Sequence, residues 1–253
     1  MEFQLSWSAR RQLLYYAVGI FLATILLFVL WQTFLTRQPS CQDGIQNGSE
    51  AGVDCGGSCA LLCAEEARAP NILWARALET GPQTYTAVAY IENRNQGSGA
   101  RSVPYSFKLY DDKNELAVER EGTVDVPPVS VVPVILPNID LGNRTVARTI
   151  FTFSATPQWE RVRADILPQV RITEQQLTAD GKRLSATIVN EGLTEVRNLA
   201  VAGVVFDAQG VARAASVTVI GRIAAKASEP AVFTWGSEVA DVARAEITVL
   251  PSF

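Results

Sequence analysis

Hydrophobic residues follow two different patterns along the chain. Residues 13–35 are almost entirely apolar and contain no charged side chain. From about residue 67 onward, short alternating runs rich in Val, Ile, Thr, Phe and Tyr are separated by clusters of Gly, Pro, Asn and Asp. The first pattern predicts one long helix, and the second predicts short β-strands joined by turns.

The apolar stretch has the length and the flanking residues of a membrane span. A helix of roughly 20 residues crosses the hydrocarbon core of a bilayer. Tyr15 and Tyr16 near one end and Trp31 near the other fit the two interfacial belts where aromatic side chains gather. The pattern predicts a transmembrane helix over residues 12–35, with the lipid bilayer as its partner.

The basic residues around this span predict its orientation. Arg10 and Arg11 precede it and only Arg37 follows closely, which favours a cytoplasmic N-terminus over residues 1–11. We therefore expect a single-pass protein of the cell membrane whose C-terminal ectodomain is extracytoplasmic. The alternative is a cleaved signal peptide. Its apolar core is usually only about 7–15 residues long, and residues 36–40 contain no small-x-small cleavage site.

A cysteine-rich module is predicted over residues 36–66. Its text is dominated by Gly and small polar residues, which cannot build a core without covalent or metal cross-links. An even number of cysteines outside the cytoplasm favours two disulfides, with three pairings left open, over a four-thiolate zinc site. The four cysteines are Cys41, Cys55, Cys59 and Cys63.

Oxygen-bearing side chains in the same module suggest a calcium hypothesis. Asp43, Asn47, Glu50 and Asp54 lie among glycines and carry the oxygen ligands that Ca²⁺ prefers. Their spacing does not follow the EF-hand loop. Asp-Gly and Asn-Gly pairs also form turns without any ion, so the turn interpretation stands beside the calcium one. No other cofactor is expected.

The region after the module is expected to be all-β. Strand-like runs recur without intervening amphipathic helices, which disfavours a parallel α/β fold and suits β-sandwiches. An internal repeat of about 90 residues predicts two tandem immunoglobulin-like sandwiches, over residues 67–159 and 160–253. In each copy two strands are joined by a turn, at Gly81-Pro82 and at Asp180-Gly181.

Two polar positions recur in both copies of the repeat. Asn93 aligns with Asn190, and we expect each to end a strand. Asp111 aligns with Asp207, and each starts an acidic turn after the third strand of its copy. A carboxylate at that position can accept local backbone N–H bonds.

The third strand of the first copy has a readable alternation. Phe107 and Leu109 fall on one face and are expected in the core, whereas Tyr110 points the other way. The string from Phe107 to Asp111, FKLYD, resembles the signature of the FxLYD domain, an extracellular β-sandwich of bacteria and archaea. The second copy departs from it, with Gly203 in place of Phe and Phe206 in place of Tyr. The resemblance implies architecture and location, without catalytic residues.

The cysteine segment carries a second resemblance. Its text, CQDGIQNGSEAGVDCGGSC, is similar to a module that recurs beside adhesive or β-sandwich domains in secreted surface proteins. This resemblance implies a structural linker or cap.

Composition narrows the function further. The chain has no histidine, which excludes Ser-His-Asp and Cys-His nucleophiles and histidine-bearing metal sites. The net charge is −4 without a basic stripe, so a nucleic-acid partner is not expected. No spaced pair of carboxylates supports a carboxylate-only hydrolase. We therefore expect a non-enzymatic protein.

Three tryptophans and one proline-rich run invite functional interpretations. Trp74, Trp159 and Trp235 could form a carbohydrate platform, but each lies within or beside a predicted strand, so core packing is expected. The prolines in residues 124–133 exclude a central strand there and predict an edge strand or connector.

The sequence thus predicts a membrane-anchored structural or protein-interaction module of the cell envelope. A protein partner in the envelope is expected. The alternative is a surface receptor that binds a glycan, a peptidoglycan fragment or, through calcium, an adhesion partner.

Overall fold

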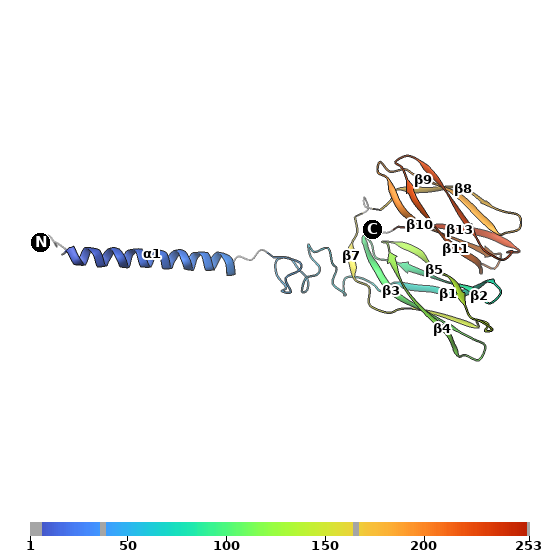
Figure 1. The fold of residues 1–253 in the computed structure, drawn as a ribbon, viewed down its shortest axis with the longest axis horizontal. Coiled ribbons are helices and arrows are strands. Elements are labelled where there is room, and N and C mark those ends of the chain that lie inside the picture. Colours follow the sequence, from blue (N-terminus) through green and yellow to red (C-terminus); the bar gives the residue numbers. More distant parts are fainter. Residues whose placement is uncertain (1–6, 36–38, 164–166, 252–253) are drawn as a thin grey trace. The chain divides into compact units, whose positions relative to one another are not determined.

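The computed structural model describes residues 7–35, 39–163 and 167–251. The chain divides into two compact units, residues 1–54 and 55–253. The first unit contains one helix, α1 (Trp7–Leu35), which begins upstream of the predicted span boundary at residue 12. The second contains all the strands of the described residues (Figure 1). The predicted N-terminal apolar helix and β-rich remainder are thereby confirmed.

Between Leu13 and Trp31, helix α1 is apolar on every side. The most apolar 18-residue window of the stretch Trp7–Thr33 has a mean hydropathy of 2.5, and none of that window is buried against the protein. The hydroxyls of its two threonines are satisfied within the helix, since that of Thr24 donates to the Phe21 carbonyl and that of Thr33 to the Val29 carbonyl. A helix with internally satisfied polar groups and an apolar surface suits a lipid environment.

Thirteen strands lie in the described part of the second unit, and every pairing between them is antiparallel. Seven come from the first copy of the repeat and six from the second. They are β1 (Asn71–Gly81), β2 (Thr84–Asn93), β3 (Ser98–Tyr110), β4 (Leu116–Val126), β5 (Ser130–Asp140), β6 (Arg148–Phe153), β7 (Trp159–Arg161), β8 (Val170–Leu177), β9 (Arg183–Asn190), β10 (Val196–Asp207), β11 (Ala212–Ile223), β12 (Ser228–Thr234) and β13 (Val242–Leu250).

The strands form four sheets, two in each half of the unit. The first half has the orders β1-β2-β5 and β4-β3-β6, with β7 also paired to β3. The second half has the orders β12-β9-β8 and β11-β10-β13. The turns expected at Gly81-Pro82 and Asp180-Gly181 do join the first two strands of each half. The immunoglobulin-like assignment stays a prediction.

Three hydrophobic clusters lie between these sheets. The first joins both sheets of the first half, through Ala89 of β2 and Phe107 of β3, for example. The second joins both sheets of the second half, through Phe233 of β12 and Val201 of β10. The third, which we call the inter-half cluster, joins β1 and β2 of the first half to β10 and β11 of the second. Its buried members are Leu78, Val88, Tyr90, Val204, Phe206, Ala212 and Ala215.

Strands β2 and β10 are therefore covered on both faces. In β2, Ala87, Ala89 and Ile91 enter the core of the first half, whereas Val88 and Tyr90 enter the inter-half cluster. Successive side chains on a strand point to opposite faces, so burial of both faces requires a nearly continuous apolar run. This explains why the middle of β2 does not alternate in polarity.

Strand β7 crosses the predicted boundary between the two halves at residues 159 and 160. It pairs with the start of β3, where Ala100 faces Trp159 and Ser98 faces Arg161. The backbone N–H of Val162 then donates to the carbonyl of Gly97 at 2.8 Å. The sheet of the first half thus extends at least to Arg161.

The proline-rich run occupies an edge, as predicted. Strand β4 ends at Val126, Pro127 and Pro128 form the connection, and Pro133 lies within β5. Strand β5 pairs with β2 alone and is an edge of its sheet. The missing N–H of Pro133 can therefore be tolerated there.

Candidate functional site

All four cysteines are oxidised. A disulfide joins Cys55 to Cys63, and Cys41 and Cys59 are disulfide-bonded as well, so that no free cysteine remains in the described residues. Zinc binding by cysteine needs thiolates, and a disulfide offers none. The predicted disulfides are confirmed, and the zinc alternative has no ligands in this state of the chain.

The loop closed by the Cys55–Cys63 disulfide is hydrogen-bonded to β7. The N–H of Leu62 donates to the carbonyl of Trp159, and the N–H of Arg161 donates to the carbonyl of Ala60, both at 2.8 Å. The guanidinium of Arg161 also donates to the Gly57 carbonyl. The second part of the cysteine module therefore covers a short strand edge of the first half, which agrees with a structural role.

The four residues of the calcium hypothesis form a network of turn hydrogen bonds. The Asp54 carboxylate accepts from the N–H groups of Asp43 and Gly44, at 2.9 Å each. Asp43 accepts from the amide of Asn47 at 2.8 Å, and Glu50 accepts from the N–H of Asn47 at 3.1 Å. These contacts support the turn interpretation. The side-chain oxygen of Asn47 is buried without a hydrogen-bond partner, and calcium binding stays a hypothesis.

Asn93 and Asn190 end β2 and β9, and each makes the same kind of hydrogen-bonded loop connection, which we call a corner. The amide of Asn93 donates to the carbonyls of Ser98 and Pro127, and its oxygen accepts from the N–H of Asn95. Asn190 donates to three carbonyls in the equivalent loops and accepts from the N–H of Gly192. Both side chains are buried. They tie two loops together at one end of each half.

Asp111 and Asp207 make a matching pair of corners after β3 and β10. One carboxylate oxygen of Asp111 accepts from the N–H groups of Lys113 and Glu115. Asp207 accepts in the same way from residues 209 and 211, and its second oxygen also binds the Arg213 guanidinium at 2.7 Å. The predicted local N–H bonds are confirmed at both positions. These carboxylates are structural acceptors.

The other residues of the FKLYD string behave as the alternation predicts. Phe107 and Leu109 are fully buried in the first core, and Tyr110 lies on the opposite face with the Arg148 guanidinium 4.6 Å from its ring. The string therefore supplies core packing and a turn.

The tryptophans do not form an exposed platform. Trp159 and Trp235 are buried, and the indole N–H of Trp235 donates to the Gly181 carbonyl. Trp74 is partly buried and stacks on Tyr90, with ring centroids 4.7 Å apart. The expected packing role is confirmed for Trp159 and Trp235, and Trp74 packs against the inter-half cluster.

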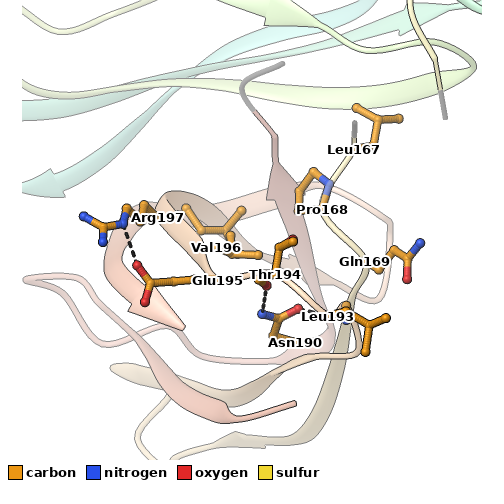
Figure 2. Close-up of a pocket in the computed structure, with 11 residues that line it drawn as sticks. Leu167, Pro168, Gln169, Asn190, Leu193, Thr194, Glu195, Val196 and Arg197 are labelled. Atoms are coloured by element: carbon orange, nitrogen blue, oxygen red, sulfur yellow. Dashed lines mark hydrogen bonds and ion pairs between the residues drawn. The ribbon is translucent and has the colours of Figure 1, made fainter. Parts of the chain in front are cut away.

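A pocket of about 370 Å³ lies at the loop end of the second half (Figure 2). Several of its polar side chains are already engaged. Asn190 is committed to the corner described above, and Glu195 pairs with Arg197 and Arg222 at 2.5 Å each. Burial raises the pKa of Glu195, but the two guanidinium groups outweigh it and hold that pKa below its ordinary value. The pocket is thus lined by a charge-paired carboxylate together with apolar side chains such as Leu193 and Pro168.

The sequence did not predict the polar contact between the two halves. The hydroxyl of Tyr90 in β2 donates to the Glu246 carboxylate in β13 at 3.1 Å. Burial, with the nearby negative charge of Glu246, raises the pKa of Tyr90. The Arg244 guanidinium lies 4.3 Å from the ring centroid of Phe206 beside it. The only sequence signal was the continuous apolar run of β2, which a one-sided strand does not need.

Comparison with known proteins adds no assignment. No family model matches the chain, and no curated protein matches it.

Proposed function

We propose that this chain is a single-pass membrane protein whose ectodomain is a non-enzymatic structural and protein-interaction module of the cell envelope. The observation that carries the proposal is the length of α1 and its exposed apolar surface. Its stretch Trp7–Thr33 is long enough to cross a bilayer and has no side of its most apolar window buried against protein. An apolar surface of this size is unfavourable in water, so it needs lipid or another helix to cover it.

The oxidised cysteines support an extracytoplasmic location for the region C-terminal to the helix. Disulfides persist in oxidising compartments and are rare in the cytosol. The first of the four cysteines comes six residues after the end of α1, at Cys41. The excess of arginine before the span agrees with export of the C-terminal side.

The architecture supports a role in binding or spacing. In each half, two antiparallel sheets share one core, as expected of the immunoglobulin-like sandwich that the FKLYD string suggests. The polar residues that the repeat has in common are engaged in corners, and the buried tryptophans disfavour the glycan-receptor alternative.

Thiol labelling tests this proposal, because the native cysteines are all oxidised. Two single-cysteine variants of the full chain form a matched pair, Ser8→Cys before the span and Thr123→Cys on the exposed surface of β4. A membrane-impermeant maleimide applied to intact cells should label the second and spare the first until lysis. The chain should also resist carbonate extraction from membranes. Labelling of residue 8 alone in intact cells, or release by carbonate, would refute the proposal.

A further inference from the structure

Strand edges in this protein are guarded, with one exception among the described strands. An edge strand exposes unpaired backbone N–H and C=O groups, and proteins block such edges with prolines, charges or short length. Strands β5 and β12 contain prolines, β1, β4, β8 and β13 each carry a charged residue at or beside the middle position, and β6 has six residues. Strand β11 is twelve residues long, and its residues 214–221 include neither proline nor charge.

Core packing explains only part of this apolar run. Ala214 and Ile220 enter the core of the second half, and Ala215 enters the inter-half cluster. Val219 is 62% exposed, and Val217, on the same face, is only partly buried. Two β-branched apolar residues therefore stand at the middle of an edge where packing within the chain does not require them.

The equivalent strand of the first half shows how such an edge is normally blocked. Strand β4 pairs with β3 as β11 pairs with β10, and Leu116 opposite Tyr110 matches Ala212 opposite Phe206. At the centre of β4 lies the run Glu119-Arg120-Glu121. If β4 paired with its own copy around Arg120, the two glutamates would face each other across the pair, and like charges directly opposite destabilise a sheet.

We propose that β11 is a self-association edge, which pairs antiparallel with β11 of a second copy around a two-fold axis at Thr218. In this register Thr218 faces its own copy, and Val217 faces Val219 of the second copy on both sides of the axis. Neither Arg213 nor Arg222 then faces an arginine, because their positions fall opposite residues 223 and 214. Cross-strand Thr–Thr and β-branched pairs stabilise antiparallel sheets.

The flanking charges agree with this register. Arg213 is paired with Asp207 at 2.7 Å, and Arg222 with Glu195 at 2.5 Å. The arginine at each end of the segment thus lies against a carboxylate, which Arg222 shares with Arg197, and the centre of the segment carries no charge. A two-fold interface uses the same patch on both copies, so a self-complementary segment is what it requires.

A second copy of the chain is thus one partner for the protein-interaction role proposed above. This inference rests on that proposed function, because the function places both copies in one membrane. Two chains anchored in one membrane are confined to a thin layer, which raises the effective concentration of one edge for the other. A single edge pairing between free proteins would be weak. The same pairing between anchored chains is favoured without any further contact.

Disulfide trapping in the full chain tests the register. Thr218→Cys introduces a thiol that should face its copy, within the distance that a cross-strand disulfide spans. In native membranes under mild oxidation, this variant should form covalent dimers at least tenfold faster than Thr123→Cys, which lies at an exposed edge position of β4. Mixed Val217→Cys and Val219→Cys chains should trap a heterodimer, whereas either variant alone should not.

A lysine that blocks the edge of β11, with the same lysine on β4 for comparison, provides the matched control. Val219→Lys, added to the Thr218→Cys chain, should reduce trapping to the rate of the β4 probe, and Thr123→Lys in the same background should leave it unchanged. Trapping at equal rates from residues 123 and 218 would overturn the inference, since a dimer formed through α1 alone predicts that result. Cross-links from residue 218 to a different protein would overturn it as well. Carbonate resistance, measured on the same membranes, reports the anchor separately.

Discussion

The two halves of the ectodomain share their corners and differ in their cores. Asn93 and Asn190, like Asp111 and Asp207, make matching hydrogen bonds at matching places. At the centre of the third strand, however, the first half has Phe107 and the second has Gly203. The polar residues at the corners of the repeat are therefore the same in both halves, whereas the large side chain between them is present only in the first half.

The missing ring of the second half is supplied by a neighbouring strand. A Cβ atom on Gly203 would lie 2.7 Å from the ring of Phe233, which fills the space above it. The register places Phe233 opposite Leu184, where the first half has Leu136 opposite Ala87. Large and small side chains have thus exchanged strands, and cores tolerate such exchanges when the total volume is kept.

The largest expected effect in this comparison comes from removing the Phe107 ring of the first half. Phe107 is fully buried and packs edge-to-face on Tyr105 and Phe151. Phe107→Ala should lower the free energy of unfolding by about 3–5 kcal/mol. Chemical denaturation of the full chain in non-ionic micelles measures it. Lys108→Ala, on the opposite face of the same strand, should change it by less than about 0.5 kcal/mol.

A smaller effect is expected when a side chain is added to the second half. Gly203→Ala should destabilise by about 1–3 kcal/mol, because its methyl group overlaps the Phe233 ring. Phe233→Leu in the same chain should recover part of that loss, since it opens the space that the methyl group needs. Hydrogen exchange can assign the change to β10 and β12. If the two substitutions simply add, the proposed exchange of volumes between strands is wrong.

The sequence predicted those parts of the fold that depend on local pattern. Alternation around Phe107 and Leu109 gave the core face of β3, and the Asp and Asn positions gave the corners, because turn chemistry is decided by neighbouring residues. The cysteine pairing was left open, since any of three pairings satisfies the same spacing. Only the three-dimensional structure distinguishes the Cys55–Cys63 disulfide from the other possible pairings.

The contact between the halves was not predictable for a different reason. Periodicity shows whether a strand has one buried face, but a continuous apolar run such as that of β2 is compatible with several environments. The partners of Tyr90 lie more than 100 residues away, at Phe206 and Glu246. Nothing in the local sequence of either segment specifies the other.

The smallest expected effect is a difference between the two acidic corners, at Asp111 and Asp207, in how their contribution to stability depends on pH. Asp207 has Arg213 beside it, where the matching position of the first half is Ala117. The hydrogen bond from the Val211 N–H, which outweighs the opposing effect of burial, lowers the pKa of Asp207, and Arg213 lowers it further. A carboxyl whose folded pKa lies below its unfolded value of about 3.9 stabilises the fold above that pH. Its contribution is lost as the pH falls through the folded pKa.

Asp207→Asn should therefore make the second half less stable at pH 7, and the difference from the unmodified chain should shrink as the pH falls below about 4. Thermal unfolding across this pH range measures the difference, with hydrogen exchange in β10 and β11 as the local readout. Asp112→Asn removes the same charge from an exposed turn position and serves as the control. A difference that stays constant down to about pH 2 would mean that the corner depends on the shape of Asp207 and not on its charge, and that Arg213 adds no electrostatic distinction between the halves.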